Sequence, residues 1–142
     1  MQIDTALVVD DHEAVRQAMC DRIKLSFAGC ELRQACSIVE ALKIVEAERV
    51  DVVLMDVQMP GMNGIDGTRE VLQRSPHTAI VVVSTYDDLN HRIAAGQAGA
   101  KAYVCKRSLH RELIPALEYL MQHEPQLDPN SMEHPVPAPA GY

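Results

Sequence analysis

Hydrophobic and polar positions divide this chain into two kinds of segment. Short apolar runs typical of β-strands are separated by longer stretches in which apolar residues recur every three or four positions, as in amphipathic helices. The strand-like runs are residues 3–9, 31–36, 50–55, 78–83 and 102–105. Strands that alternate with helices in this way predict an α/β fold, in which helices cover both faces of a parallel sheet.

The third and fourth strand-like runs are apolar throughout. Residues 52–55 read VVLM and residues 79–83 read AIVVV. A strand with apolar side chains on both faces is typical of the centre of a parallel sheet. We therefore place these two strands in the interior of the sheet.

The first helix is predicted over residues 12–27. Its apolar positions recur every fourth residue and should form an inward stripe: Val15, Met19, Ile23 and Phe27. A second helix should begin after Ser37, because Ser37 and Glu40 have the spacing of a capping box. The apolar face of that helix would be formed by Ala41, Leu42 and Val45.

The third and fourth helices are bounded by residues with strong positional preferences. The third should run over residues 64–74 and end before Pro76, because proline disfavours helix at the residue that precedes it. The fourth should begin near Asp88 and end at Gly99, which can adopt the left-handed conformation common after a helix.

The fifth helix should be capped by Ser108 and should run to about His123. Pro115 lies inside that range, and a proline within a helix removes a backbone hydrogen bond at a cost of about 3 kcal/mol or more. This helix is therefore predicted either to start late or to bend.

Size and composition are those of a single domain. The 142 residues, of which 47% are apolar, suffice for one core, and we predict a domain over 1–124. Residues 125–142 are rich in proline and lack apolar periodicity, so they should form a flexible tail or a truncated interdomain linker. The sequence contains no membrane span and no signal peptide, which favours a cytoplasmic protein.

Charge and cysteine content argue against several other classes of protein. A net charge of −7 without a basic cluster is unsuited to direct binding of nucleic acid, so DNA binding would need another domain. The cysteines form no Cys-x-x-Cys pair, which indicates neither a zinc cluster nor a disulfide framework. We expect reduced and mostly buried thiols at Cys20, Cys30, Cys36 and Cys105.

Polar residues follow the apolar runs where the strands should end. In a flavodoxin-like, doubly wound (βα)5 fold with strand order 2-1-3-4-5, ligands bind at the carboxyl ends of the strands, beside the point where the strand order reverses. One crevice would then hold the polar residues that close the first, third, fourth and fifth strands: Asp10, Asp11, Asp56, Ser84 and Lys106.

These groups suit a phosphoryl group and a metal ion. Neighbouring carboxylates repel one another by about 1–4 kcal/mol per pair near a protein surface, and a divalent cation would relieve this repulsion. Oxygen ligands favour a hard ion such as Mg²⁺. Asp56 would act as the nucleophile, and Mg²⁺, Lys106 and the Ser84 hydroxyl would share the phosphoryl charge.

Four ordered motifs carry a family resemblance: LVVDD, LMDVQMPGMNG, VVVST and YVCK. In their order and separations they resemble the receiver domain of bacterial two-component response regulators, over about residues 4–122. The sequence DDH, followed by Val15 and Arg16, is most similar to receivers of the LuxR/NarL-type transcriptional regulators, which carry a helix-turn-helix DNA-binding domain.

The resemblance implies a role for each acidic residue. Asp56 would accept a phosphoryl group from a sensor histidine kinase or a phosphotransfer protein. Asp11 would bind Mg²⁺, or Mn²⁺ as a substitute, directly, and Asp10 would bind it mainly through water. The backbone carbonyl of Gln58 would complete the protein ligands, and Lys106 would pair with the phosphoryl oxygens.

The resemblance also implies a two-state switch rather than an enzyme. Ser84 would turn inward to the phosphoryl group, and Tyr103 would move toward the space that Ser84 leaves. The altered surface would favour a homodimer or control transcription through an output domain absent from this chain. Phosphotransfer and autodephosphorylation would be self-catalysed, without turnover of a separate substrate.

Several residues around the site depart from the family pattern or could tune it. Arg107 follows Lys106 where many receivers have proline, so the cis peptide common there is not expected. Thr85 stands where the family usually has alanine or glycine, which would narrow access to Asp56. Gln58 and Tyr86 should flank the path of water to an acyl phosphate, and we expect bulky Tyr86 to slow hydrolysis.

Other interpretations compete at this site. His12 could act as a transition-metal ligand, although a histidine at the start of a helix is more often exposed. A phosphatase similar to the haloacid dehalogenase group would need a second acid at the position of Gln58. A degenerate receiver would act as a phosphate-independent interaction scaffold. The presence of all five site residues favours the phosphoacceptor, and uptake of phosphate would separate the two.

Overall fold

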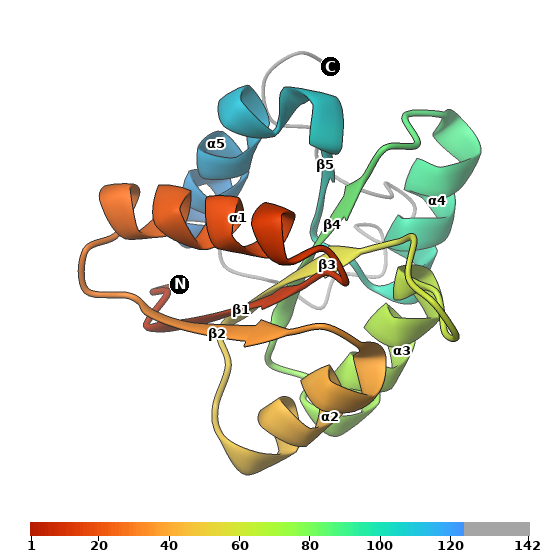
Figure 1. Cartoon of the computed structure of the whole chain (residues 1–142), viewed down its shortest axis with the longest axis horizontal. Coiled ribbons are helices and arrows are strands. Elements are labelled where there is room, and N and C mark those ends of the chain that lie inside the picture. Colours follow the sequence, from red (N-terminus) through yellow and green to blue (C-terminus); the bar gives the residue numbers. More distant parts are fainter. Residues whose placement is uncertain (124–142) are drawn as a thin grey trace.

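Five parallel strands form a single sheet at the centre of the molecule (Figure 1). The computed structural model describes residues 1–123, so the predicted domain end at 124 and the tail over 125–142 lie outside the described residues. The strand order is β2-β1-β3-β4-β5, which confirms the predicted order. The strands are β1 Thr5–Val9, β2 Glu31–Ala35, β3 Val52–Asp56, β4 Ala79–Ser84 and β5 Ala102–Cys105.

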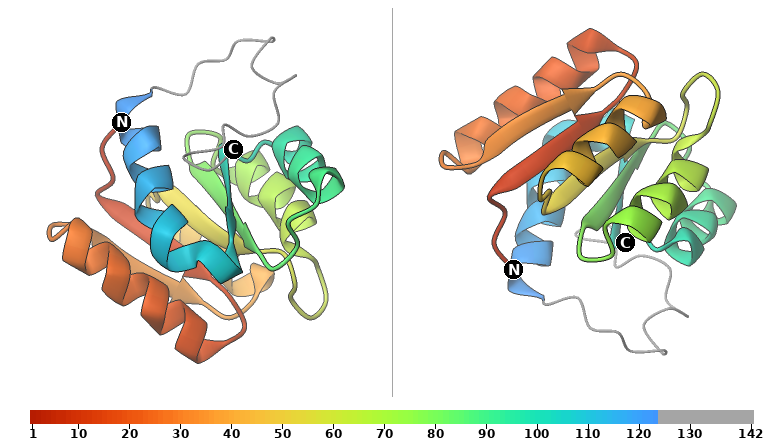
Figure 2. Two further views of the ribbon diagram at one scale, coloured as in Figure 1. Left: turned by 90° about the horizontal axis from the view of Figure 1, so that it is seen from above. Right: turned by 90° about the horizontal axis from the view of Figure 1, so that it is seen from below.

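Helices cover both faces of the sheet, as expected when parallel strands are joined by crossover connections. Figure 2 shows α1 and α5 on one face and α2, α3 and α4 on the other. The helices are α1 Glu13–Ser26, α2 Ile38–Ala47, α3 Gly64–Arg74, α4 Leu89–Ala98 and α5 Leu109–Gln122. None of the described helices is long and apolar enough to cross a membrane.

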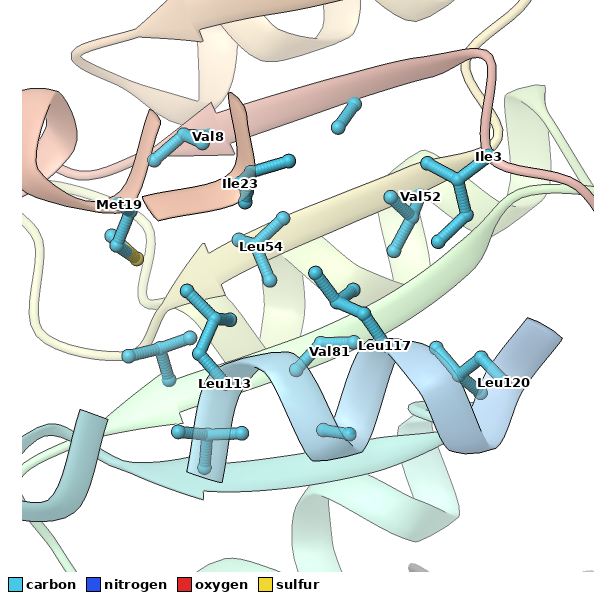
Figure 3. Packing of buried hydrophobic residues seen from close by; sticks show 14 of the residues in the cluster. Ile3, Val8, Met19, Ile23, Val52, Leu54, Val81, Leu113, Leu117 and Leu120 are labelled. Atoms are coloured by element: carbon cyan, nitrogen blue, oxygen red, sulfur yellow. The ribbon is translucent and has the colours of Figure 1, made fainter. Parts of the chain in front are cut away.

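The sheet separates two apolar cores, because successive side chains of a strand point to opposite faces. Leu54 of β3 packs with α1 and α5, and Figure 3 shows it close to Ile23 and Leu113. Its neighbour Val53 packs on the other face with α2, α3 and α4. Every residue of β3 and β4 is buried, which confirms their predicted place in the interior.

Side chains cap the first turns of α2 and α3. Ser37 Oγ accepts a hydrogen bond from the Glu40 amide at 3.2 Å, as the capping box predicts. The Glu40 carboxylate instead accepts from Cys36 Sγ at 3.3 Å. Asn63 caps α3 by accepting from two backbone amides of its first turn, a role that the sequence analysis missed.

The ends of α4 match the predicted residues. Asp88 accepts a hydrogen bond from the His91 amide at 3.1 Å at the start of the helix. Gly99 ends the helix with a φ of 110°, a left-handed conformation that a side chain would strain. Its amide donates to the last carbonyls of α4.

The start of α5 differs from expectation. A 3₁₀ turn, Lys106–Ser108, precedes the helix, and Ser108 makes no side-chain cap hydrogen bond. The Ser108 hydroxyl accepts from the Arg111 guanidinium at 2.9 Å instead, so the predicted cap is wrong. The helix begins at Leu109 and continues through Pro115, which excludes a late start and leaves a bend as the prediction.

The cysteines are free thiols, in agreement with the absence of a Cys-x-x-Cys pair. Cys20, Cys30 and Cys105 are buried, whereas Cys36 is exposed. Burial is the main cause that raises the pKa of the Cys20 and Cys30 thiols. These two groups therefore behave as small apolar core residues rather than as reactive thiolates.

Candidate functional site

Two buried carboxylates and one ammonium group meet at the carboxyl end of the sheet. The pairing of Val9 with Met55 places Asp10, which follows β1, beside Asp56, the last residue of β3. Asp10 is 0% exposed and Asp56 is 1% exposed. Lys106 Nζ lies 2.9 Å from Asp10 Oδ2 and 3.1 Å from Asp56 Oδ1, so one cation is shared by two acids.

The surroundings of the cluster raise the pKa of both Asp56 and Lys106. Burial, followed by repulsion from Asp10, raises the pKa of Asp56 despite the opposing effects of Lys106 and the Gln58 amide. Burial alone would lower the pKa of Lys106, but its hydrogen bonds and ion pairs with the two carboxylates together raise it. The charged form of Lys106 is therefore favoured, and that of Asp56 is disfavoured.

One oxygen of Asp56 has no hydrogen-bond partner among residues 1–123. Asp56 Oδ1 accepts from the Gln58 amide at 3.3 Å and contacts Lys106, whereas buried Oδ2 has no hydrogen bond. Leaving a buried carboxylate oxygen unpaired is costly, so such an atom indicates an ordered water, a bound ion or a chemical role. The unpaired oxygen, together with the neighbouring carboxylates, fits a hard divalent cation or an electrophile.

Asp11 and His12 form the outer rim of the cluster. His12 Nδ1 lies 3.1 Å from Asp11 Oδ1 and 3.3 Å from Asp10 Oδ1. The His12 side chain is 68% exposed, which confirms the expected exposure. Ligand atoms of Asp10, Asp11 and His12 all lie within 4.8 Å of one another, so Asp11 is well placed to hold a cation and His12 borders the same space.

Arg16 holds the backbone of Asp10 in place, a role that was not predicted from the sequence. Its guanidinium donates to the Asp10 backbone carbonyl at 2.8 Å and to Gln34 Oε1 at 3.1 Å. Arg16 lies on the first turns of α1, one helical turn after His12. The spacing between His12 and Arg16 could have indicated this role, because it places the long arginine side chain beside the end of β1.

Gly64 allows α3 to approach the end of β3. A Cβ atom at this position would collide with the backbone carbonyl of Asp56. The Gly64 amide donates to the Val57 carbonyl at 2.9 Å, which closes the loop between β3 and α3. The loop therefore folds back tightly, and the backbone that follows Asp56 stays at the edge of the acidic cluster, which is formed by Asp10, Asp11 and Asp56.

Ser84 and Tyr103 lie on adjacent strands, and both are 0% exposed. Ser84 Oγ accepts from the Tyr86 amide at 3.0 Å, and the Tyr103 hydroxyl donates to the Tyr86 carbonyl at 2.6 Å. Burial is the main cause that raises the pKa of Tyr103. The tyrosine ring is therefore already part of the core, with its hydroxyl attached to the loop after β4.

Three exposed residues link the loop after β3 to the loop after β4, beside the acidic cluster. Gln58 Nε2 donates to the Tyr86 hydroxyl at 2.9 Å, and Thr85 Oγ1 donates to Gln58 Oε1 at 2.7 Å. The Tyr86 ring stacks on His91, with 4.2 Å between the ring centroids. The sequence analysis placed Gln58, Thr85 and Tyr86 near the site, but it did not predict that they bind one another.

Comparisons with known sequences point to one family. A model described as the response regulator receiver domain matches residues 6–118. The uncharacterized transcriptional regulatory protein YhcZ of Bacillus subtilis is 38% identical over 112 residues, which are 76% of this chain and 50% of the relative. The response regulator MprA of Mycobacterium avium is 33% identical over 127 residues, which are 89% of this chain and 55% of the relative. The chain thus spans about half the length of these relatives.

Solved structures share the fold. A two-component response regulator of the LuxR family from an Aurantimonas species gives a TM-score of 0.80 at 26% identity, covering 94% of this chain and 95% of that one. The chemotaxis protein CheY4 of Vibrio cholerae gives a TM-score of 0.75 at 27% identity, covering 84% of this chain and 99% of that one.

Proposed function

The chain belongs to the response regulator receiver family, and from this premise we propose that Asp56 is its phosphoacceptor. The single observation that carries this assignment is the buried Oδ2 of Asp56, which has no hydrogen bond within the described residues while Oδ1 of the same carboxylate contacts the Lys106 ammonium group. Receiver domains act in two-component systems, so the donor would be a phosphohistidine of a sensor kinase or a phosphotransfer protein.

The proposed reaction is a transfer between two side chains. Asp56 Oδ2 attacks the phosphorus atom, an O–P bond forms, and the N–P bond breaks with its electron pair returning to the donor imidazole. Lys106 Nζ, which contacts Asp56 Oδ1, would pair with a phosphoryl oxygen and stabilise the charge that accumulates there. Asp10 keeps that ammonium group in place from the other side.

A divalent cation suits the donor set of the pocket. Mg²⁺, with Mn²⁺ as a substitute, would be held by the carboxylates of Asp10, Asp11 and Asp56 and by the backbone carbonyl of Gln58. When bound, it would neutralise charge on the phosphoryl oxygens. The support for this proposal is the chemistry of the carboxylates and the unpaired Asp56 oxygen.

Ser84 and Tyr103 would couple phosphorylation of Asp56 to a change in the protein surface. An added phosphoryl group brings about −1.5 to −2 charge at neutral pH, which would attract the Ser84 hydroxyl. Because Ser84 Oγ accepts from the Tyr86 amide, a turn toward Asp56 would move the loop that also holds Tyr103. We expect this coupled change to alter the face formed by α4, β5 and α5.

The output of this change is proposed to be transcriptional. The relatives named above include a transcriptional regulatory protein about twice as long as the matched segment, and one structural neighbour is a LuxR family regulator. A LuxR/NarL-type output domain outside this chain would bind DNA in the cytoplasm, with a phosphorylation-dependent homodimer as the active form. The chain itself would carry out phosphotransfer and autodephosphorylation without acting on a separate substrate.

Intact mass spectrometry would test the assignment directly. After incubation with acetyl phosphate and Mg²⁺, the protein should gain one phosphoryl group, and Asp56→Asn or EDTA should abolish the gain. Asp66→Asn is the matched control, because Asp66 is an exposed acid on α3 and should leave labelling unchanged. Failure of the wild type to gain mass, while a known receiver is labelled in parallel, would instead favour a phosphate-independent scaffold.

A further inference from the structure

The guanidinium group of Arg92 lies over the ring of Tyr103, and the proposed switch gives it no role so far. Arg92 lies on the first turns of α4, and its guanidinium carbon is 4.7 Å from the centroid of the Tyr103 ring. The Arg92 side chain is only 12% exposed, so solvent screens the contact weakly. The guanidinium also forms an ion pair with Asp87, in the loop between β4 and α4.

We propose that Arg92 is a positioning residue that holds Tyr103 in its buried place by covering the ring while Asp87 fixes the guanidinium. Tyr103 is then held at two points, its hydroxyl by the Tyr86 carbonyl and its ring by Arg92. Both contacts come from the same loop and helix start. A movement of this segment therefore loosens the hydroxyl and the ring together.

Tyr86 connects the contacts of Tyr103 and Arg92 to the acidic cluster. Its amide donates to Ser84 Oγ, its carbonyl accepts from Tyr103, and its hydroxyl accepts from Gln58. The Gln58 amide in turn donates to Asp56 Oδ1. A continuous series of contacts thus runs from Asp56 to the start of α4, and Arg92 with Asp87 is its far end.

This proposal rests on the proposed function, because Tyr103 matters for signalling only if Asp56 is phosphorylated. It adds that the balance between buried and displaced Tyr103 is set by a residue outside the pocket. Arg92 contacts the Tyr103 ring and Asp87, whereas Lys106 contacts Asp10 and Asp56, so substitution of Arg92 should affect the response and not the acceptance of phosphate.

Fluorine NMR of the full chain with 3-fluorotyrosine would test the position of the ring, with Tyr103→Phe used to assign the signal. Arg92→Gln should raise the ratio of displaced to buried Tyr103 about tenfold, and Arg92→Lys should restore part of the difference because a lysine also binds an aromatic face. Asp87→Asn, at a half-exposed loop position, should give a smaller change in the same direction.

Two controls keep the test specific. Arg69→Gln breaks an exposed ion pair with Asp66 on α3 and should leave the Tyr103 signal unchanged. Intact mass after acetyl phosphate treatment should show one phosphoryl group on Arg92→Gln, as on the wild type. If that variant fails to fold, Arg92→Lys and Asp87→Asn still report the position of the ring.

The outcomes separate the two proposals. A Tyr103 signal that is the same in the wild type, Arg92→Gln and Asp87→Asn would overturn the role of Arg92, whether or not Asp56 is labelled. Absence of labelling in the wild type would overturn the proposed function, and the signal of Tyr103 would still decide whether Arg92 holds the ring.

Discussion

At the amino end of the sheet two buried hydroxyls, Ser75 and Thr78, bind one another, whereas at the carboxyl end two buried carboxylates meet the partly buried ammonium group of Lys106. Thr78 Oγ1 donates to the Val50 carbonyl at 2.8 Å, and the Ser75 hydroxyl lies 2.6 Å from Thr78 Oγ1. Because the Thr78 proton is used on Val50, Ser75 must be the donor of the second bond. All these groups are satisfied.

At the carboxyl end Asp10 and Asp56 share the cation of Lys106, and Asp56 Oδ2 has no hydrogen-bond partner in the described part of the chain. A sheet that needs only to be stable has no reason to bury such a group, since an unpaired polar atom costs free energy. The amino end therefore contributes stability, whereas the carboxyl end keeps a destabilising group that the proposed phosphoacceptor role requires. Changing each end in turn tests this contrast.

The largest effect is expected when the shared cation is removed. Lys106→Met leaves Asp10 and Asp56 buried and facing each other, which should lower the free energy of unfolding by about 3 kcal/mol at neutral pH in EDTA. Urea denaturation measures this loss. Lys43→Met, an exposed position on α2, is the control and should change stability by less than about 0.5 kcal/mol. Equal stability of the two variants would show that water already screens the pocket.

At the amino end the loss should be smaller and should leave the site intact. Thr78→Val keeps the shape of the side chain but removes the donor to Val50 and the acceptor for Ser75, at a cost of about 2 kcal/mol. Thr78→Ser keeps the hydroxyl and is the matched control. Denaturation should separate the two variants, while labelling by acetyl phosphate stays that of the wild type. A loss of labelling in Thr78→Val would contradict the division between the two ends.

The third change should increase stability. The raised pKa of Asp56 means that the folded chain holds this proton more tightly than the unfolded chain. The contribution of Asp56 is therefore fully present below its unfolded pKa, and it is lost as pH rises through the raised folded pKa. Asp56→Asn removes the charge and should gain about 1 kcal/mol at neutral pH, with the gain shrinking toward pH 4. Denaturation in EDTA at both pH values measures the difference, and a destabilised variant would mean that Lys106 more than offsets burial.

The carboxyl-end acids were predictable because their positions follow from strand periodicity. Runs such as VVLM predict a buried strand. The carboxyl ends of parallel strands then lie together at one edge of the sheet, independently of the loop conformations. The strand boundary was off by one residue, because Asp56 is the last residue of β3 and not the first after it.

Contacts between loops were not predictable in the same way. Gln58 and Tyr86 are 28 residues apart, and their hydrogen bond depends on the rotamers of two exposed side chains. The contact of Arg92 with Tyr103 depends equally on how α4 packs beside β5. By contrast, the cap at Asn63 had a readable signal, because asparagine before a helix start is a favoured N-cap.

The smallest expected effect concerns the exposed loops beside the acidic pocket, where side chains are partnered but not buried. Tyr86 stacks on His91 and accepts from Gln58, so its ring is held over the edge of the site. Tyr86→Ala removes both contacts and should speed autodephosphorylation about threefold to tenfold, because water would reach the acyl phosphate more easily. Loss of the phosphoryl mass with time, after acetyl phosphate is removed, measures the rate.

Tyr86→Phe separates the bulk of the ring from its hydroxyl. The phenylalanine ring can still stack on His91, but Gln58 Nε2 loses its acceptor while Thr85 continues to hold Gln58 Oε1. If bulk alone slows water, this variant keeps the wild-type rate. If the hydrogen bond fixes Gln58 across the path, it should dephosphorylate about twice as fast. An unchanged rate in Tyr86→Ala would rule out both explanations and leave hydrolysis to the buried groups of the pocket.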